Sequence, residues 1–228
     1  MRCFRNGFLA LLLPFASWAM LTAQTHLVDG FKKLPDGTTV AIMPIDVELF
    51  TVTAGGVYEP QAEWTAKASK NLKEAILERT LPGKGHFQEL PGEVDETLAE
   101  LAHLHGAVAR AIIIHHFGSL KLPSKQGKLD WSMGEATGAI RKRVDADYAL
   151  YVHLRDSYAS GGRKATMVLW AALGVGIPGG AQVGYATLVD TRTGQVVWFN
   201  RMVNVSGDVR EPDPARKTLE NLLTGFPG

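Results

Sequence analysis

The sequence predicts a single layered α/β (α+β) domain. We expect a mixed sheet of about five strands with a C-terminal β-hairpin and packed helices, after an N-terminal signal peptide. Three observations predict this class. The 228 residues have an ordinary globular composition, 46% hydrophobic and 21% charged. Segments of helical and strand periodicity alternate in the first part of the chain, and strand-like segments then cluster. The length suits one domain with a full core.

The N-terminus has the pattern of a secretory signal. Arg2 and Arg5 precede an uncharged stretch from Asn6 to Thr25, and small residues follow it near Ala23. A basic start, an apolar centre and a small-residue exit are typical of a signal peptide, with cleavage expected after Ala23. A retained membrane anchor is the alternative, because the stretch is just long enough to span. We expect a signal peptide over 1–23, a lead-in over 24–37 and the domain over 38–228.

Cleavage would change the chemistry available to the chain. It would remove Cys3, the only cysteine, and change the formal net charge from +1 to −1 because Arg2 and Arg5 are lost. The mature chain would then have no disulfide and no thiol nucleophile. Cys3 also precedes the apolar run, so it is not the lipid-bearing first residue of a mature lipoprotein. The near-neutral charge excludes a typical nucleic-acid binder. We therefore expect a soluble periplasmic protein.

The spacing of apolar residues and the positions of proline and glycine predict the first elements of the chain. Residues Thr38–Ile45 are apolar and β-branched, which predicts a buried strand. A loop follows that contains Ala54-Gly55-Gly56. From about Gln61 to Thr80 apolar residues recur every three or four positions, which predicts a helix that Pro82-Gly83 stops.

The middle of the chain alternates in the same way. His86–Leu90 is a short strand by its pattern. Asp95 is placed to cap a second helix that continues to about Phe117. We expect a loop from Leu120 to Met133 and a third helix from Gly134 to Val144.

Strands dominate the rest. Asp147–Leu154 is rich in aromatic and aliphatic residues, which predicts a strand. Gln182–Val189 and Gln195–Val205 form a hairpin whose turn, Asp190–Gly194, ends in a glycine that tolerates positive φ. Pro214–Phe226 closes the chain as a helix.

The segment Ala165–Pro178 stands apart because it carries no charge and follows Arg163 and Lys164. It is too short for a helical membrane span. One interpretation is a buried helix or strand between two hairpins. The other is a surface element that meets lipid or another protein. On the second interpretation the contact residues are Met167, Leu169, Trp170, Leu173 and Ile177.

The candidate catalytic residues have weaker support in the sequence than the candidate contact residues. A metal site would draw on His103, His105, His115 and His116, but residues one or two apart on a helix face different ways. The alternative interpretation is that these histidines lie in the core or face solvent and bind no metal. The sequence has no G-x-S-x-G elbow and no P-loop, and Pro178 removes an amide from the glycine-rich stretch at 174–180. We expect no cofactor and no nucleotide.

Several stretches resemble a family of proteobacterial exported proteins over residues 38–227. They are Asp147–Val152, Arg155–Arg163, Leu188–Asn200 and the closing Leu222-Leu223 with Phe226-Pro227. The hairpin at 188–198 is more distantly similar to curli-secretion-channel-like periplasmic lipoproteins and to the TolB N-terminal domain.

The resemblance implies an α/β sheet domain that serves envelope assembly or transport and is not catalytic. In the curli-channel relatives, segments between strands become membrane-crossing hairpins within a ring. The segment 165–178 lies in a comparable place, but it lacks the alternation of a barrel strand, and the chain lacks the lipid-bearing cysteine.

The sequence as a whole predicts a periplasmic, secretion-associated envelope protein that works by protein–protein contact, including self-assembly. Peripheral membrane contact is the alternative for its surface. The alternative function is a histidine-dependent metal-binding hydrolase.

Overall fold

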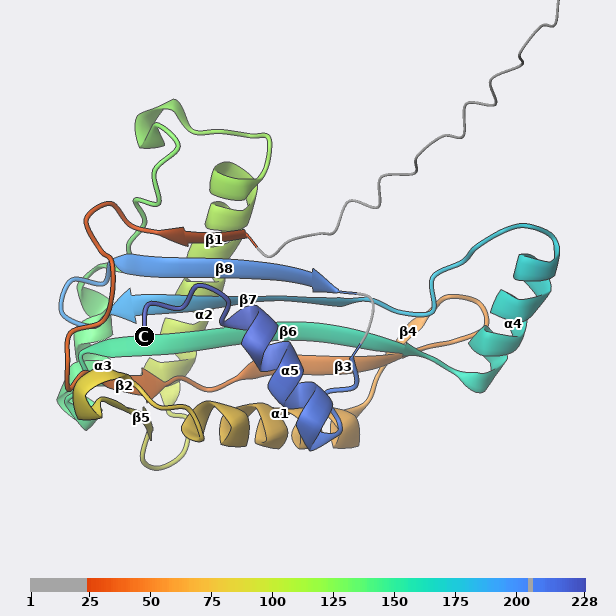
Figure 1. The fold of residues 1–228 in the computed structure, drawn as a ribbon, viewed down its shortest axis with the longest axis horizontal. Coiled ribbons are helices and arrows are strands. Elements are labelled where there is room, and N and C mark those ends of the chain that lie inside the picture. The colour runs from red at the N-terminus through yellow and green to blue at the C-terminus, as the bar shows by residue number, and fades with distance from the viewer. Residues whose placement is uncertain (1–23, 205–206) are drawn as a thin grey trace, which may run out of the picture.

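The computed structural model describes residues 24–204 and 207–228 and has the predicted α/β class (Figure 1). One mixed sheet runs in the order β1-β8-β7-β6-β2-β5, and β3 also pairs with β6, carrying β4 at its outer side. The strands are β1 (Gln24–Leu27), β2 (Thr39–Ile42), β3 (Asp46–Val52), β4 (Tyr58–Pro60), β5 (His86–Glu89), β6 (Tyr148–Ala159), β7 (Gln182–Asp190) and β8 (Val196–Asn204).

The central strand is β6, which is longer than the sequence predicts. Its first residues pair in parallel with β2, and its later residues, His153 to Ala159, pair in parallel with β3. On its other side β6 pairs antiparallel with β7, and β7 with β8, which confirms the predicted hairpin. The extra length of β6 follows from β3, since a strand continues as long as a neighbour satisfies its backbone.

The segment between β2 and the first helix differs from the prediction. We expected a loop there, but the structure forms the antiparallel hairpin of β3 and β4. Val47, Leu49 and Val52 are buried, whereas the residues between them are more exposed. The glycines that suggested a loop lie in the hairpin turn, where Gly56 has a φ of 83°.

The sheet also has more strands than the expected five or so, because β1, β3 and β4 join it. β1 comes from the lead-in and pairs antiparallel with β8 from Leu27↔Trp198 to Gln24↔Arg201. Leu34 of the lead-in is fully buried, and its backbone N–H donates to Pro227 O at 2.7 Å. The lead-in therefore packs with the rest of the described chain. The expected signal at 1–23 lies outside the described residues.

Helices cover both faces of the sheet. α1 (Ala62–Leu77) and α5 (Pro212–Leu222) lie in front of it in Figure 1, and α2 (Glu96–Ile112) lies behind, with α3 (Gly138–Val144) at one end. Each face has its own core. The front core includes Leu72, Ile76, Leu150 and Trp198, and the back core includes Ile112, Ile140, Tyr151 and Phe199.

α2 begins as the sequence predicts, because the Asp95 carboxylate accepts a hydrogen bond from Leu98 N at 3.0 Å. A wider turn, Ile113–Phe117, continues it. Together, Glu96–Phe117 is long and apolar enough to cross a membrane by length and composition. The apolar residues Leu98, Leu101 and Ile112 are buried in the back core, whereas Leu104 and Ile114 of the same stretch are exposed. At the other end of the chain α5 stops at Leu222, short of the expected Phe226, before Gly225 takes a φ of 71°.

Candidate contact surface

The segment 161–178 forms an arm that stands away from the rest of the molecule. It begins with α4 (Gly161–Ala172), which leaves the end of β6 beyond the sheet and returns to β7 through an irregular stretch (Figure 1). No residue of α4 is buried. The buried interpretation of residues 165–178 is therefore wrong, and the segment lies on the surface. Periodicity alone does not separate the two interpretations, because a helix that is apolar on all sides has no polar face to mark its orientation.

The predicted contact residues divide into two groups. Leu169 and Leu173 are 64% and 68% exposed, and Trp170 is 44% exposed. Val168, which was not among the predicted contact residues, is 71% exposed, the highest value among the large hydrophobic residues described. Met167 and Ile177 are only half-buried. Met167 packs toward the base of the arm, where it lines a pocket with Gly179.

Hydrogen bonds to backbone groups cap both ends of the helix in the arm. At the start of α4, the Ser160 hydroxyl accepts a hydrogen bond from Arg163 N at 3.1 Å. At the tip, Trp170 O accepts from both Leu173 N and Val175 N, and Gly174 takes a φ of 78°. The first bond satisfies an N–H group, and the other two satisfy a carbonyl group, that helix ends usually leave to water.

The base of the arm is fixed to β6 by close contacts. Ser157 Oγ accepts from Ala181 N at 2.9 Å, and it donates to Ala181 O at 3.1 Å. A Cβ at Gly180 would overlap the carbonyl oxygen of Ser157, so only glycine permits this approach. The Arg163 guanidinium donates to Pro178 O at 3.0 Å and joins the two sides of the arm.

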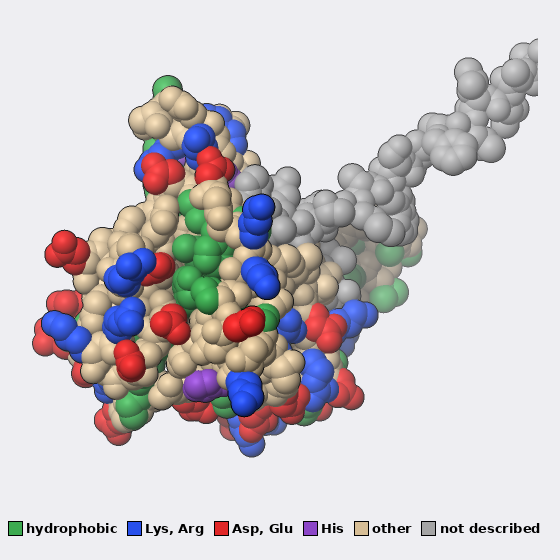
Figure 2. Space-filling model, turned by 60° about the vertical axis from the view of Figure 1, so that its left-hand side comes forward, with side chains coloured by type: hydrophobic (Ala, Val, Ile, Leu, Met, Phe, Trp, Pro, Cys, Tyr) green, Lys and Arg blue, Asp and Glu red, His purple; other side chains and the backbone are tan. Residues whose placement is uncertain are grey.

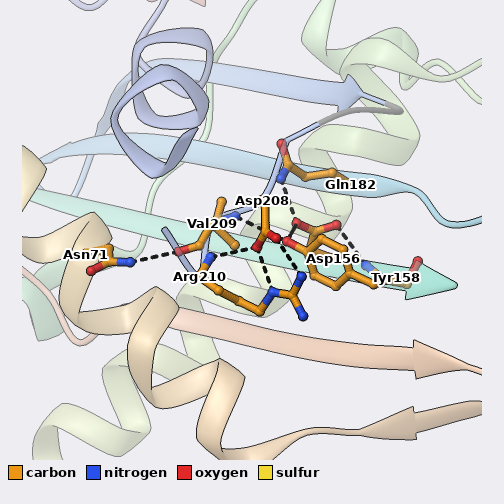
Figure 3. Close-up of polar contacts among 8 residues, drawn as sticks. Asn71, Asp156, Tyr158, Gln182, Asp208, Val209 and Arg210 are labelled. Atoms are coloured by element: carbon orange, nitrogen blue, oxygen red, sulfur yellow. Dashed lines mark hydrogen bonds and ion pairs between the residues drawn. The ribbon is translucent and has the colours of Figure 1, made fainter. Parts of the chain in front are cut away.

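Beneath the arm, Asp156 lies almost fully buried in a polar cluster (Figure 3). Its carboxylate accepts hydrogen bonds from Tyr158 Oη at 2.6 Å, Gln182 Nε2 at 2.7 Å and the N–H of Ser157 at 2.8 Å. Burial raises the pKa of Asp156, although these three donors oppose the shift. The sequence alone does not point to this residue, because an acid in a strand gives no signal of its burial.

The same cluster joins β6 to α1 and to the loop before α5. Tyr158 Oη accepts from Val209 N at 3.2 Å, and Asn71 of α1 donates to Val209 O at 3.1 Å (Figure 3). Arg210 donates to Asp208 at 2.7 Å and stacks over the rings of Trp64 and Tyr158. A pocket of about 420 Å³ lies between this cluster and the arm, with Asp156, Met167 and Gln182 in its lining.

Other exposed apolar residues lie near the arm. They are Val57 and Tyr58 in the β3–β4 hairpin, Val183 at the start of β7 and Val203 near the end of β8. By contrast, Lys, Arg, Asp and Glu side chains are mixed over the opposite end of the molecule, around a narrow hydrophobic strip (Figure 2). The arm end is thus the more apolar end of the described chain.

The four histidines of the metal hypothesis have separate surroundings. His105 is buried and stacks on Tyr151 with 4.0 Å between ring centroids, and burial lowers its pKa to about 3. His103 is exposed, and His115 Nδ1 lies 2.7 Å from Leu120 O. His116 is buried against Phe117. Within residues 24–204 and 207–228, no group of three or more His, Cys, Asp or Glu side chains is placed to hold a metal.

No protein-family model matches this chain, and no curated protein matches it. Among solved structures, the chain is similar to the PelC dodecamer from Paraburkholderia phytofirmans. The identity is 13% over 91% of this chain and 99% of that chain, with a TM-score of 0.40. It is also similar to the LpoB C-terminal domain from Salmonella enterica, with 15% identity, 78% and 88% coverage and a TM-score of 0.31. A lipoprotein from Neisseria meningitidis follows, with 13% identity, 75% and 81% coverage and a TM-score of 0.28.

Proposed function

We propose that this protein is exported to the periplasm and acts there without catalysis, by assembling with copies of itself through the arm in envelope assembly or transport. The observation that carries the proposal is α4, an uncharged helix from Ala165 onward with no buried residue. Apolar surface costs roughly 25 cal/mol for each Å² that stays in water. An uncharged stretch with no buried residue favours a partner surface that covers it.

The compartment follows from the N-terminal pattern. The basic start, the apolar stretch and the small residues before Gln24 are typical of a protein sent through the inner membrane. If the signal were retained, the same protein would be anchored in the membrane with its domain outside the cytoplasm.

A second copy is the occupant that the distribution of apolar surface favours. Nine of the 15 large hydrophobic side chains that are exposed in the described residues lie in the arm, in the β3–β4 hairpin, or on β7 and β8. They are Val57, Tyr58, Val168, Leu169, Trp170, Leu173, Val175, Val183 and Val203. The same chain therefore carries both a projecting apolar element and an apolar surface to receive one. Two copies can cover both at once.

The test is the oligomeric state of the mature chain, measured by light scattering after size exclusion over a range of concentrations. We expect Trp170→Asp with Leu173→Asp to leave the protein folded and to abolish assembly. The matched control places the same charges elsewhere, with Val94→Asp and Leu120→Asp, at side chains that are 57% and 67% exposed. This control should assemble as the wild type does.

Two results would overturn the proposal. One is an arm variant with wild-type circular dichroism that still assembles, and the other is a wild-type chain that stays monomeric at every concentration. Should the double Asp variant lose its fold, Trp170→Ser with Leu173→Ser answers the same question with less disruption.

A lipid surface is the second candidate, favoured by one feature. Arg163 and Lys164 are the only charged residues between Gly161 and Ala181, so the arm has a basic base and an uncharged tip. Such a helix suits anionic lipid. Flotation with phosphatidylglycerol vesicles distinguishes the two. Self-assembly predicts no flotation, whereas flotation that is lost in the Trp170→Asp, Leu173→Asp variant would replace the second copy with a membrane.

The histidine-dependent hydrolase has its own test. Metal analysis of protein purified without a histidine tag should find no stoichiometric zinc. Zinc that is present at one per chain and lost on His105→Ala would overturn the non-catalytic proposal.

A further inference from the structure

A polar pocket of about 410 Å³ lies beside α3, at the end of the molecule opposite the arm (Figure 1). Four segments meet there: the loop before β2, the helix α3, the entry to β6 and the turn between β7 and β8. The volume is within the range of roughly 300–1,000 Å³ that is usual for ligand pockets. We call it the end pocket and define it by six residues of its lining, which are Asp36, Arg141, Asp147, Tyr148, Asp190 and Arg192.

Charges of both signs line the end pocket without pairing across it. Arg141 and Arg192 supply two guanidinium groups, and three aspartates supply carboxylates. Among the described residues, neither arginine forms an ion pair with any of these three carboxylates. Arg141 has one ion pair, at 3.9 Å, with the almost fully exposed Asp145 outside the pocket. Because exposed pairs of this kind contribute little to stability, Arg141 can exchange that contact for a ligand.

Hydrogen bonds from the backbone hold two of the carboxylates in place. Asp147 Oδ2 accepts from Thr39 N at 3.0 Å, which joins the entry of β6 to β2. Asp190 Oδ1 accepts from Arg192 N at 2.8 Å and from Thr193 N at 3.0 Å, which fixes the turn between β7 and β8. Within the described part of the chain, the second oxygen of each carboxylate makes no hydrogen bond. A ligand can therefore bind these oxygens without disturbing the fold.

Tyr148 supplies a hydroxyl group that has no partner. The residue is only 9% exposed, and its ring packs edge to face on Phe31 with 5.9 Å between centroids. Its hydroxyl makes no hydrogen bond to residues 24–204 or 207–228, although buried polar groups normally have a partner. Burial and the nearby carboxylates of Asp190 and Asp147 raise the pKa of this phenol. The hydroxyl therefore keeps its proton at neutral pH and can donate it to an acceptor in the pocket.

We propose that the end pocket binds a free basic amino acid, such as lysine or arginine. The α-carboxylate of the ligand contacts Arg141 and Arg192 and accepts from Tyr148, and its two cationic groups contact the aspartates. The formal charges decide between classes of amino acid. Three carboxylates and two guanidinium groups give the lining a charge of −1, which a basic amino acid of charge +1 neutralises. A ligand without charges would leave these groups unpaired, so the lining disfavours it.

The first experiment is calorimetric titration of the exported protein with L-lysine and with analogues that each lack one charge. Cadaverine lacks the carboxylate and norleucine lacks the side-chain ammonium, so each should bind about tenfold more weakly than lysine. L-Glutamate should not bind. Equal affinity for L-glutamate and L-lysine, or no binding of lysine and arginine at about 10 mM, would overturn the proposal.

A further analogue identifies the source of the ligand. Nα-acetyl-lysine has the charges of the last residue of a peptide and lacks the α-ammonium group. We expect it to bind about tenfold more weakly than lysine, because one cationic group no longer contacts the aspartates. Equal affinity for the two would overturn the free amino acid in favour of the end of a peptide.

The second experiment locates the site with substitutions that keep the shape of the side chain. Arg192→Gln and Asp147→Asn should each weaken lysine binding about tenfold, and Tyr148→Phe about fivefold. Cadaverine has no carboxylate, so Arg192→Gln should not weaken its binding. Arg79→Gln removes an exposed arginine outside the pocket and is the matched control, which should bind lysine as the wild type does.

Circular dichroism shows whether each variant is folded. Wild-type affinity for lysine in folded Arg192→Gln and Asp147→Asn variants would overturn the end pocket as the site. Should Asp147→Asn lose its fold, Asp36→Asn in the exposed loop before β2 tests the acidic side of the pocket instead.

The end pocket and the arm lie at opposite ends of the molecule, so the two proposals can fail separately (Figure 1). The folded Trp170→Asp, Leu173→Asp variant should bind lysine with wild-type affinity. Loss of lysine binding in that variant would overturn the end pocket as the site. A wild-type chain that binds lysine and stays monomeric would support the end pocket and overturn only self-assembly.

Discussion

At the scale of single residues, Asp156 connects the arm to the body of the protein. Its carboxylate receives three donors, and two of them, Tyr158 and Gln182, come from the segments on either side of the arm. A buried carboxylate is stable only with such partners, so each partner depends on the others. The arrangement gives the base of the arm a defined position.

We predict that Asp156→Ala lowers the free energy of unfolding by about 2–3 kcal/mol, because it leaves the Tyr158 hydroxyl and the Gln182 amide buried without their acceptor. Urea denaturation at pH 7 measures the change. Tyr158→Phe, which removes one donor, should cost about 1 kcal/mol. An Asp156→Ala variant as stable as wild type would show that water replaces the carboxylate.

The lowered pKa of Asp46 predicts that the protein loses stability in acid. Hydrogen bonds and charge from His153 and Arg155 lower its pKa from 3.8 to about 2. Because the folded-state pKa is the lower one, its contribution is present above about pH 4 and disappears as the pH falls through about 2. The carboxylate is half-exposed, so we expect about 1 kcal/mol. Denaturation between pH 5 and 2 should show a shallower decline for Asp46→Asn, and an identical decline would contradict this assignment.

At the scale of elements, the arm and the hairpin at 46–60 show that tertiary contacts can override the structure that the local sequence pattern predicts. Both contain glycine; the sequence predicts a loop for the first part of the hairpin, and for the arm it leaves open a buried or a surface element. The hairpin forms because β3 pairs with the part of β6 beyond β2, where each strand satisfies the backbone of the other. The arm becomes a helix outside the core because Gly180 and Ser157 fix its return point at the end of β6.

Gly180 therefore provides an element-scale prediction. Gly180→Ala should destabilise the protein by about 1–3 kcal/mol and make the arm more susceptible to protease, since its Cβ would overlap Ser157 O. Gly176→Ala, in the same stretch with open space around its Cβ, is the matched control and should change neither property. Thermal melts and limited proteolysis followed by mass spectrometry give the comparison.

At the scale of the whole molecule, the lead-in belongs to the packing of the domain. A chain that begins at residue 38 lacks β1 and the buried Leu34, and it exposes the edge of β8. We expect such a chain to unfold at a markedly lower temperature than one beginning at residue 24 and to aggregate, because an unpaired strand edge is a template for further strands. Equal melting temperatures for the two chains would show that the lead-in is dispensable.

Local sequence patterns predict most of the elements and the class of the fold. Hydrophobic period, proline, glycine and the Asp95 cap specify α1, α2, β6 and the β7–β8 hairpin, because those signals act within a few residues of chain. The sequence also isolated residues 165–178 as unlike the rest.

The position of that segment on the surface becomes evident only in the folded structure. The fold also buries Asp156 and places Tyr148 beside Asp190 in register. Burial and cross-strand register depend on residues that are far apart in the chain, so no local sequence pattern predicts either of them.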